Sequence, residues 1–140
     1  MSKNLLYLLT ILEAIEKILI YKDDYSKSKD FYEADDQKSF NATLNLLTAI
    51  GEEIKKIDDS LKQKNKIINW RALAGLRDII AHNYRGIDKY LIWDIINNEL
   101  IELKSVCIGL LKIIKPNKKE LLEYLSTEFY KHIAYLKDKI

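Results

Sequence analysis

Three residues with side chains suited to acid–base and phosphate chemistry lie close together near the middle of the chain. Arg77 comes first, His82 follows five residues later, and Tyr84 follows two residues after the histidine. A histidine can move protons near neutral pH because its pKa is about 6.5, and the planar guanidinium of an arginine matches the oxygens of a phosphate. RNA supplies its own nucleophile, the 2′-hydroxyl. Arg77 and His82 are therefore candidate catalytic residues for cleaving RNA.

The apolar residues between these side chains predict that they lie on a helix that is otherwise buried. On such a helix Arg77 and His82 point about 140° apart, because five residues turn a helix by about 500°. A site that uses both needs a long swing of the arginine or a second copy of the chain, as in a two-fold dimer. Asp78 lies one turn before His82, where it would orient the imidazole or remain in solvent. Asn83 would contact RNA or cap the helix end.

The hydrophobic pattern predicts an all-α protein, an antiparallel bundle of about five helices with short connections. Apolar residues recur at three- and four-residue steps, and no segment alternates with a period of two for long. Residues 23–35 and 58–68 lack a helical period and are expected to be connections. The helices themselves are expected over residues 4–22, 36–57, 69–85, 88–114 and 117–138.

Short polar residues mark the expected helix starts, because their side chains accept hydrogen bonds from N–H groups that have no partner in the first turn. Asp35 or Asp36, Asn69, Asp88 and Asn117 stand at these positions. The sequence therefore predicts a side-chain cap at the start of each of the last four helices.

Two glycines and the single proline predict details of the backbone. Gly51 lies inside the second helix, where it costs about 1 kcal/mol relative to alanine, and a close helix crossing is the expected reason for it. Gly86 is expected to end the third helix in the left-handed conformation. Pro116 separates the fourth helix from the fifth.

Other residues capable of chemistry are expected to have structural roles. Trp70 and Trp93 are expected to anchor the core or an interface rather than to stack on bases. Cys107 lies among apolar residues and is expected to pack in the core, whereas His132 is expected at the surface. A lysine cluster before the motif is expected to be solvated, with steering of RNA as the alternative. This cluster comprises Lys62, Lys64 and Lys66.

The length and composition indicate one helical domain over residues 1–140. The chain is 48% hydrophobic and 31% charged, with a net charge of +2, which is less basic than most dedicated nucleic-acid binders. No apolar run is long enough to span a membrane, and the N-terminus lacks the pattern of a secretory signal, so a cytoplasmic location is expected. One cysteine excludes an intramolecular disulfide framework. Two histidines and one cysteine, well separated, match no zinc spacing, so neither a metal nor another cofactor is predicted.

The motif Arg77-x4-His82-x-Tyr84 resembles the signature of the HEPN superfamily, specifically the HepT-like toxins. The similarity extends to the flanks of the motif and to the first two helices, and covers residues 4–114. The segments that carry it are Leu12–Ile18, Ala49–Glu53, Trp70–Arg77, Gly86–Asp88, Ile92–Trp93 and Asn98–Leu100.

The resemblance implies an all-helical homodimer that acts as a metal-independent endoribonuclease toxin of a toxin–antitoxin pair. It also implies a partner, a minimal nucleotidyltransferase antitoxin of the MntA type, which attaches AMP to the motif tyrosine, here Tyr84. Such an anion beside Arg77 and His82 would block a substrate phosphate. Two features depart from the family pattern. Asp78 stands where asparagine is common, and the helix over 117–138 lies beyond the matched region.

Two interpretations compete with the ribonuclease. One is a catalytically silent helical module that partners a nucleotidyltransferase by presenting a substrate to it. The other is a helical scaffold in which the motif is only structural, with Arg77 in a surface ion pair, His82 satisfied in the core and Tyr84 packed at the helix end.

Overall fold

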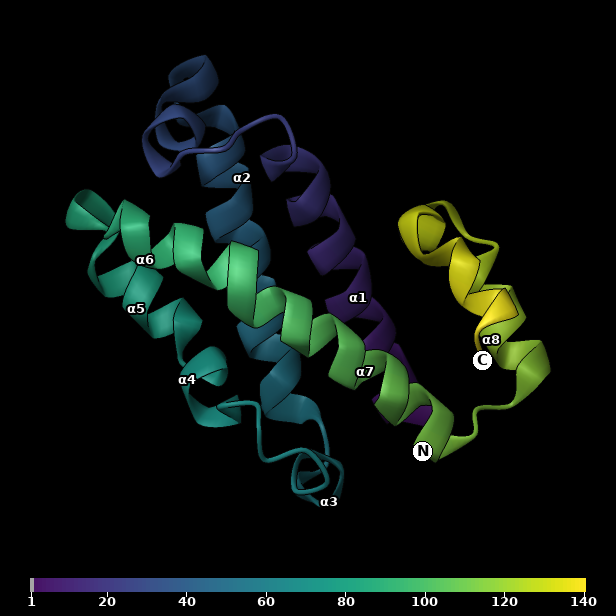
Figure 1. The fold of residues 1–140 in the computed structure, drawn as a ribbon. Coiled ribbons are helices and arrows are strands. Elements are labelled where there is room, and N and C mark those ends of the chain that lie inside the picture. Colours follow the sequence, from purple (N-terminus) through teal and green to yellow (C-terminus); the bar gives the residue numbers. More distant parts are fainter. Residues whose placement is uncertain (1) are drawn as a thin grey trace.

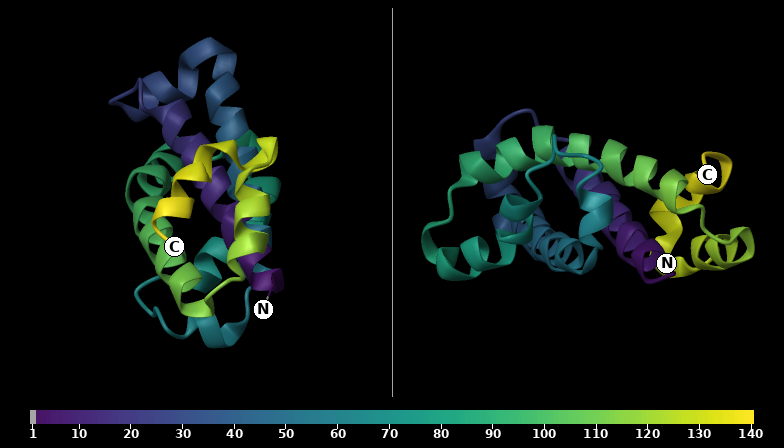
Figure 2. Two further views of the ribbon diagram at one scale, coloured as in Figure 1. Left: turned by 90° about the vertical axis from the view of Figure 1, so that its right-hand side faces the viewer. Right: turned by 90° about the horizontal axis from the view of Figure 1, so that it is seen from below.

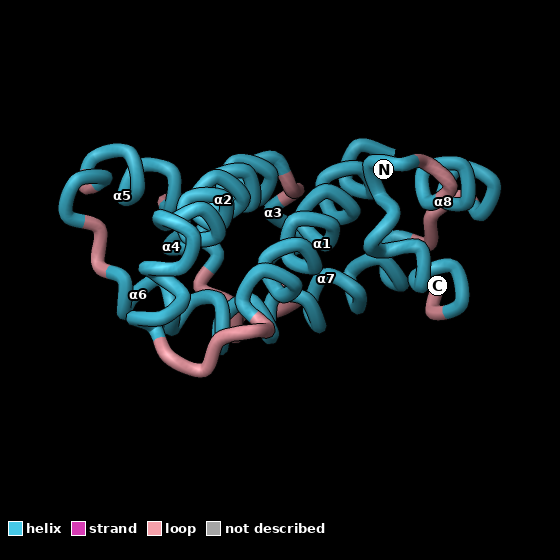
Figure 3. Tube along the Cα trace, turned by 90° about the horizontal axis from the view of Figure 1, so that it is seen from above, coloured by secondary structure: helices cyan, strands magenta, loops and turns pink. Residues whose placement is uncertain are grey.

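The computed structural model describes residues 2–140, and every regular element in this part of the chain is helical (Figure 1, Figure 3). The prediction of an all-α fold is therefore confirmed. The α-helices are α1 (Ser2–Lys22), α2 (Ser28–Lys56), α3 (Asp59–Lys62), α4 (Trp70–Ala74), α5 (Leu76–His82), α6 (Lys89–Asp94), α7 (Leu100–Ile114) and α8 (Lys118–Leu125). The other helical segments are a 3-10 turn at Tyr84–Gly86, a π-helical segment at Ile95–Glu99 and a 3-10 segment at Glu128–Asp138.

The long helices run alternately up and down, as expected for an antiparallel bundle (Figure 1). The chain ascends through α1, returns through α2, ascends again through α4 and α5, and returns through α6 and α7. α1 packs against both α2 and α7, while α4 and α5 pack on α2. The C-terminal 3-10 segment lies against α1 (Figure 2). The candidate motif is thus carried by the short helices on the outer side of α2.

The core consists of the apolar stripes of the long helices. Leu8, Leu12 and Ile15 of α1 are fully buried, as their spacing predicts. Burying a side chain of this size contributes about 1.5–3 kcal/mol. Cys107 of α7 is also fully buried, and this burial raises the pKa of its thiol to about 12. The prediction that this cysteine packs in the core is confirmed.

Gly51 lies at the close helix crossing that the sequence predicts. A Cβ atom built on it would lie 2.9 Å from the carbonyl oxygen of Leu73 and 3.3 Å from that of Ala74. Both oxygens belong to the backbone of α4, which cannot move aside as a side chain could. The absence of a side chain at Gly51 therefore lets α4 pack directly on the backbone of α2.

Three of the predicted N-caps form. The side chains of Asn69, Asp88 and Asn117 each accept hydrogen bonds from backbone N–H groups in the first turn that follows, at 2.9–3.2 Å. These caps fix where α4, α6 and α8 begin. The donors are the N–H groups of Ala72, Tyr90, Leu91 and Glu120.

The predicted connection over residues 23–35 and its cap are wrong in part. α2 begins at Ser28, and its regular geometry is interrupted at Ala34–Gln37. Asp35 and Asp36 lie in this kink, just before helical geometry resumes, but no residue that the structure describes donates a hydrogen bond to either carboxylate. Their φ angles of 48° and 54° are left-handed, a conformation that aspartate tolerates better than most residues. The helical turns before this kink are too short to show a clear apolar period in the sequence.

The third helix also differs from the prediction. It divides at Gly75 into α4 and α5, and it ends at His82 rather than near Arg85. Gly86 has no positive φ, because the chain leaves the helix through the 3-10 turn instead. The fourth helix ends as expected before Pro116, and Lys115 supplies its left-handed residue, with φ 47°.

The single helix predicted over 117–138 is two segments, α8 and the 3-10 segment Glu128–Asp138. A regular α-helix would place Phe129 on the same face as Leu121 and Leu125. Because the helix type changes, Phe129 is 58% exposed and Tyr130 is buried in its place. The hydroxyls of Tyr130 and Thr10 share a hydrogen bond of 2.9 Å.

Buried polar contacts tie this C-terminal segment to α1. Glu13 of α1 is buried and accepts hydrogen bonds from the backbone N–H and the ring of His132. His132 is therefore partly buried and paired, not a simple surface residue. Tyr135 donates to Glu16, which also forms a 3.0 Å ion pair with Lys104.

The two tryptophans have the structural roles that the sequence predicts. Trp70 donates its indole N–H to the carbonyl oxygens of Lys62 and Asn65, at 2.9 and 3.0 Å. Trp93 packs against Phe31, with ring centroids 5.5 Å apart. Among the described residues, no helix is both long enough and apolar enough to cross a membrane.

Candidate active site

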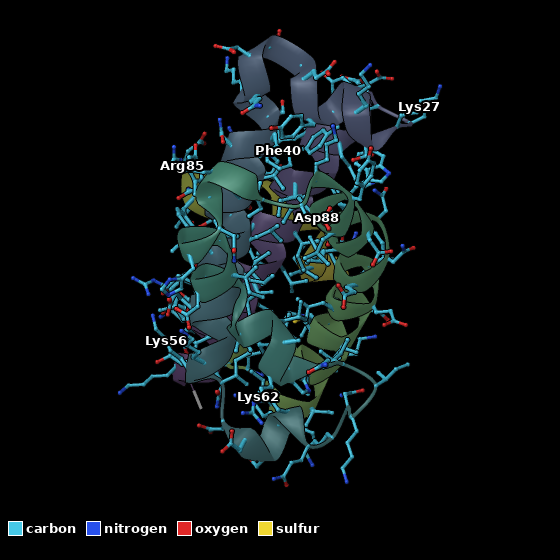
Figure 4. All side chains as sticks on the ribbon, turned by 90° about the vertical axis from the view of Figure 1, so that its left-hand side faces the viewer. Lys27, Phe40, Lys56, Lys62, Arg85 and Asp88 are labelled. Carbon is cyan, nitrogen blue, oxygen red and sulfur yellow. The ribbon has the colours of Figure 1, made fainter. Side chains whose placement is uncertain are left out.

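The motif lies on the outer face of the bundle, along α5 and in the turn that follows (Figure 4). Only Leu76 and Ile80 of α5 are buried, against α2. Arg77, His82 and Tyr84 are all exposed. The expectation of an otherwise buried element is wrong, because a helix of seven residues on the outside of α2 has one narrow apolar stripe and presents its remaining surface to solvent.

Arg77 is held between two carboxylates. Its Nε atom lies 3.4 Å from Oε1 of Glu52 on α2, and Nη1 lies 3.4 Å from Oδ1 of Asp78. All three side chains are open to solvent, so these ion pairs contribute little to stability. The two carboxylates orient the guanidinium toward α2. A substrate phosphate would have to displace them in order to bind Arg77.

His82 is the last residue of α5, and its side chain is exposed. A pocket of about 310 Å³ is formed there by residues 81–86 alone. A substrate can therefore reach the imidazole from solvent, which is the first requirement for a general acid or base.

Asp78 and Asn83 have local partners. The Asp78 carboxylate contacts Arg77, and the structure shows no hydrogen bond between Asp78 and His82, both of which it describes. The Asn83 side chain donates to the carbonyl oxygen of Ile79 at 2.9 Å, so it caps the end of α5, one of the two roles expected for it.

Tyr84 separates two pockets. Its ring is 58% exposed, and its hydroxyl donates to Oδ1 of Asn41 on α2 at 3.1 Å. On one side is the pocket beside His82; on the other is a pocket of about 300 Å³ whose walls include Tyr32 and Phe40. The hydroxyl is thus accessible and held toward α2.

Asn41 and Glu52 are neighbours of the site that the sequence pattern does not predict. Both lie on α2, far along the chain from the motif, and they reach it only because α5 packs on α2. Nothing in their local sequence marks them. The regular period of α2 is the only available signal, and it does not say which polar residue faces which neighbour.

Metal-binding side chains do not gather at the motif. Within residues 2–140, no three His, Cys, Asp or Glu side chains lie close enough to hold a metal ion. The motif has one histidine and one carboxylate, and the nearby Glu52 is paired with Arg77.

The all-helical fold exposes an Arg-x4-His-x-Tyr motif on α5 and in the turn that follows, as expected for a protein of the HEPN superfamily. Residues 11–109 match the family described as "Ribonuclease HepT-like". The chain therefore belongs to the HepT-like ribonuclease family.

Curated relatives are similar over most of the same region. The chain is 35% identical to "Putative RNase MJ0125" of Methanocaldococcus jannaschii, over 63% of this chain and 79% of the relative. It is 32% identical to "Probable ribonuclease HepT" of Thermococcus cleftensis, over 71% and 87%. It is 30% identical to "Gamma-glutamylcyclotransferase and putative RNase MJ0434" of M. jannaschii, over 81% of this chain but only 50% of that longer protein. No solved structure matches the chain significantly.

Proposed function

We propose that this protein is a metal-independent endoribonuclease, the toxin of a toxin–antitoxin pair of the HepT and MntA kind. Membership of the family and the names of its relatives support ribonuclease activity. The observation that carries the proposal is the accessible imidazole of His82, which lines a surface pocket on the same short helix as Arg77.

In the proposed mechanism His82 acts as the general base or acid and Arg77 holds the scissile phosphate. The imidazole takes the proton of the ribose 2′-hydroxyl, whose oxygen attacks the adjacent phosphorus. The bond from phosphorus to the 5′-oxygen breaks, and that oxygen takes a proton from an imidazolium or from water as it leaves, so the products are a 2′,3′-cyclic phosphate and a 5′-hydroxyl. The guanidinium stabilises the charge on the crowded phosphate, which is usually a large share of catalysis.

The site is proposed to form at a homodimer cleft. Within one chain Arg77 is drawn toward Glu52 on α2, whereas His82 lies at the far end of α5 beside its own pocket. Between them Ile79 exposes 41% of its surface. Two copies of α5 related by a two-fold axis would cover this isoleucine and bring four catalytic side chains together.

Control of the toxin is proposed to act on Tyr84. A partner nucleotidyltransferase would attach AMP to its accessible hydroxyl, displacing the hydrogen bond to Asn41. The phosphate of the adduct would then lie close to His82, where it would repel RNA and fill the pocket. Asp78 and Asn83 are proposed as supporting residues, which fix Arg77 and the end of α5.

The whole chain is proposed to act as one domain in the cytoplasm, where RNA is available. The packing of residues 128–138 on α1 supports a single unit, although this segment lies outside the family match. Neither a metal nor another cofactor is included in the proposal.

The test is cleavage of total RNA by purified protein in EDTA. Cleavage by the wild type should fall by about 10²–10⁴-fold in His82→Ala and in Arg77→Ala, the range for losing a general base or a positioned cation. Lys119→Ala, which removes an exposed cation from α8, should cleave as the wild type does. Equal cleavage by all variants would contradict the proposal.

One observation favours a silent module as the alternative. Glu52 and Asp78 both lie 3.4 Å from the Arg77 guanidinium, which reduces its attraction for phosphate. Mass spectrometry of the purified protein distinguishes the cases. Intact RNA together with protein that carries no adduct would favour the silent module, whereas AMP on Tyr84 would account for inactivity of a ribonuclease.

A further inference from the structure

A cavity of about 650 Å³ lies at the junction of α3 and α4, outside the motif. It is more than twice the volume of the pocket beside His82. Its walls come from α3, from the loop that follows, and from the first turns of α4, so it directly precedes the helix that carries the motif. The motif and the proposed mechanism make no use of this cavity.

Two cations at this cavity have no partner. Lys66 and Arg71 are exposed, and neither forms an ion pair with any residue that the structure describes. Lys62 is different, because its ammonium donates to the carbonyl oxygen of Ile54 and lies 3.5 Å from Asp59. Asp59 is the single carboxylate among the residues that line the cavity, so its pair with Lys62 leaves the charges of Lys66 and Arg71 available to an anion.

The remaining walls are largely apolar. Ile67 exposes 70% of its surface, an unusual exposure for an isoleucine, and Trp70 and Ala74 lie beside it. The indole of Trp70 is fixed by its two hydrogen bonds to backbone carbonyls. A rigid apolar surface next to unpaired cations is suited to a ligand with flat bases and a phosphate backbone.

The charge along the sequence supports the same ligand. Residues 60–77 contain five cations and no carboxylate, a net charge of +5. Because the whole chain has a net charge of +2, the other residues together have a net charge of −3 (+2 minus +5). An acidic protein and an RNA would both be attracted to such a segment, but the exposed apolar side chain of Ile67 beside single unpaired cations favours unstacked bases. The five cations are Lys62, Lys64, Lys66, Arg71 and Arg77.

The cavity lies on the same side of the molecule as the motif. Figure 4 views this side, with Lys62 near the bottom and Arg85 at the upper left. Arg71 precedes Arg77 by six residues, so their Cα atoms are separated by at most roughly 20 Å. One RNA strand can therefore contact both places.

We propose that the α3–α4 cavity is a binding subsite for single-stranded RNA, which holds one or two nucleotides of the substrate beside the cleavage site. Lys66 and Arg71 contact phosphates, and Ile67 contacts a base. The inference rests on the proposed ribonuclease function, since it concerns the substrate of that site. It assigns binding, and not cleavage, to these residues.

The test measures RNA binding in the His82→Ala background, so that the probe is not cut. A fluorescein-labelled single-stranded RNA of mixed sequence is titrated in EDTA over a range of salt concentrations, with fluorescence anisotropy as the readout. The pair Lys66→Gln and Arg71→Gln should weaken binding by about tenfold. It should also lower the slope of log affinity against log salt by about 0.7 for each phosphate that the protein no longer neutralises.

Two controls distinguish an effect of the subsite from an effect of the total charge of the protein on RNA binding. The pair Lys112→Gln and Lys119→Gln removes the same charge from exposed positions on α7 and α8 that do not line the cavity, and should change binding much less. Ile67→Ala should weaken binding without changing the salt slope, because an apolar contact releases no counterions. Thermal unfolding of each variant checks that the fold is intact.

Equal weakening by the two charge-removing pairs would overturn the subsite. So would a Lys66 and Arg71 variant that binds RNA normally but fails to bind the nucleotidyltransferase, which would make the cavity a protein interface. In both cases cleavage that depends on His82 would leave the proposed function standing. If the His82→Ala protein bound no RNA and the wild type cut none, both proposals would fail together.

Discussion

The guanidinium of Arg77 lies between Glu52 and Asp78, so an RNA phosphate must compete with carboxylates for it. Exposed ion pairs are weak, and a phosphate that accepts two hydrogen bonds from the arginine fork can replace them. The two carboxylates therefore position the guanidinium for catalysis at the cost of weaker ground-state binding.

Gly51 gives the sharpest prediction for a single residue. Gly51→Ala should lower the free energy of unfolding by about 1–3 kcal/mol, because the new methyl group would press on the Leu73 carbonyl oxygen of α4. Urea unfolding followed by circular dichroism measures the change.

Gly109 provides the matched control, because it also lies inside a helix but has nothing within 4 Å of the Cβ position. Gly109→Ala should stabilise the protein by about 0.5–1 kcal/mol, the difference in helix propensity. Destabilisation of the same size in both variants would contradict a close crossing at Gly51.

At the scale of elements, the C-terminal 3-10 segment is held to α1 by polar bonds as well as apolar contacts. His132→Ala removes a ring that donates to the buried carboxylate of Glu13, and should cost about 1–3 kcal/mol of unfolding free energy. Lys131→Ala, at the neighbouring exposed position, should cost much less, since the ammonium of Lys131 pairs with Glu128 on its own segment. Chemical denaturation of the two variants shows whether the hydrogen bond from His132 to Glu13 contributes to the free energy of unfolding.

The sequence predicts helices well where a long apolar stripe repeats, as in α1 and α7, and where a polar side chain caps the first turn, as at Asn69 and Asp88. It fails where helix geometry changes within a segment. The break at Gly75 and the change to a 3-10 segment after α8 depend on packing against α2 and α1.

The candidate site, too, is predicted only in part from the sequence. The spacing of Arg77, His82 and Tyr84 identifies the motif from sequence, because it lies within one local stretch. Its partners Asn41 and Glu52 come from a different helix, and local sequence does not show which residues of two helices will be in contact. The exposure of α5 is also not predicted, because apolar residues between polar ones look alike whether a helix lies inside or outside the bundle.

At the scale of the whole molecule, the proposed dimer makes a direct prediction. Ile79→Asp places a charge at the centre of the proposed interface, and should convert a dimer into a monomer in analytical ultracentrifugation. The monomer should also lose cleavage of RNA, because the site is proposed to need both chains.

The control for this prediction is Ile113→Asp at the other end of the molecule. Ile113 lies in the last turn of α7 and is 47% exposed, close to the exposure of Ile79. This variant should remain dimeric and active. A protein that sediments as a monomer before any substitution, yet cleaves RNA, would place the complete site within one chain.

The single cysteine can report how often the helical bundle opens. Cys107 is fully buried, so alkylating reagents can reach its thiol only when the helices part. Timed alkylation followed by intact mass would give the rate at which the thiol becomes accessible. An RNA or an antitoxin that holds the helices together would lower the rate of alkylation. The Cys107 thiol would then report binding at surfaces that it does not contact.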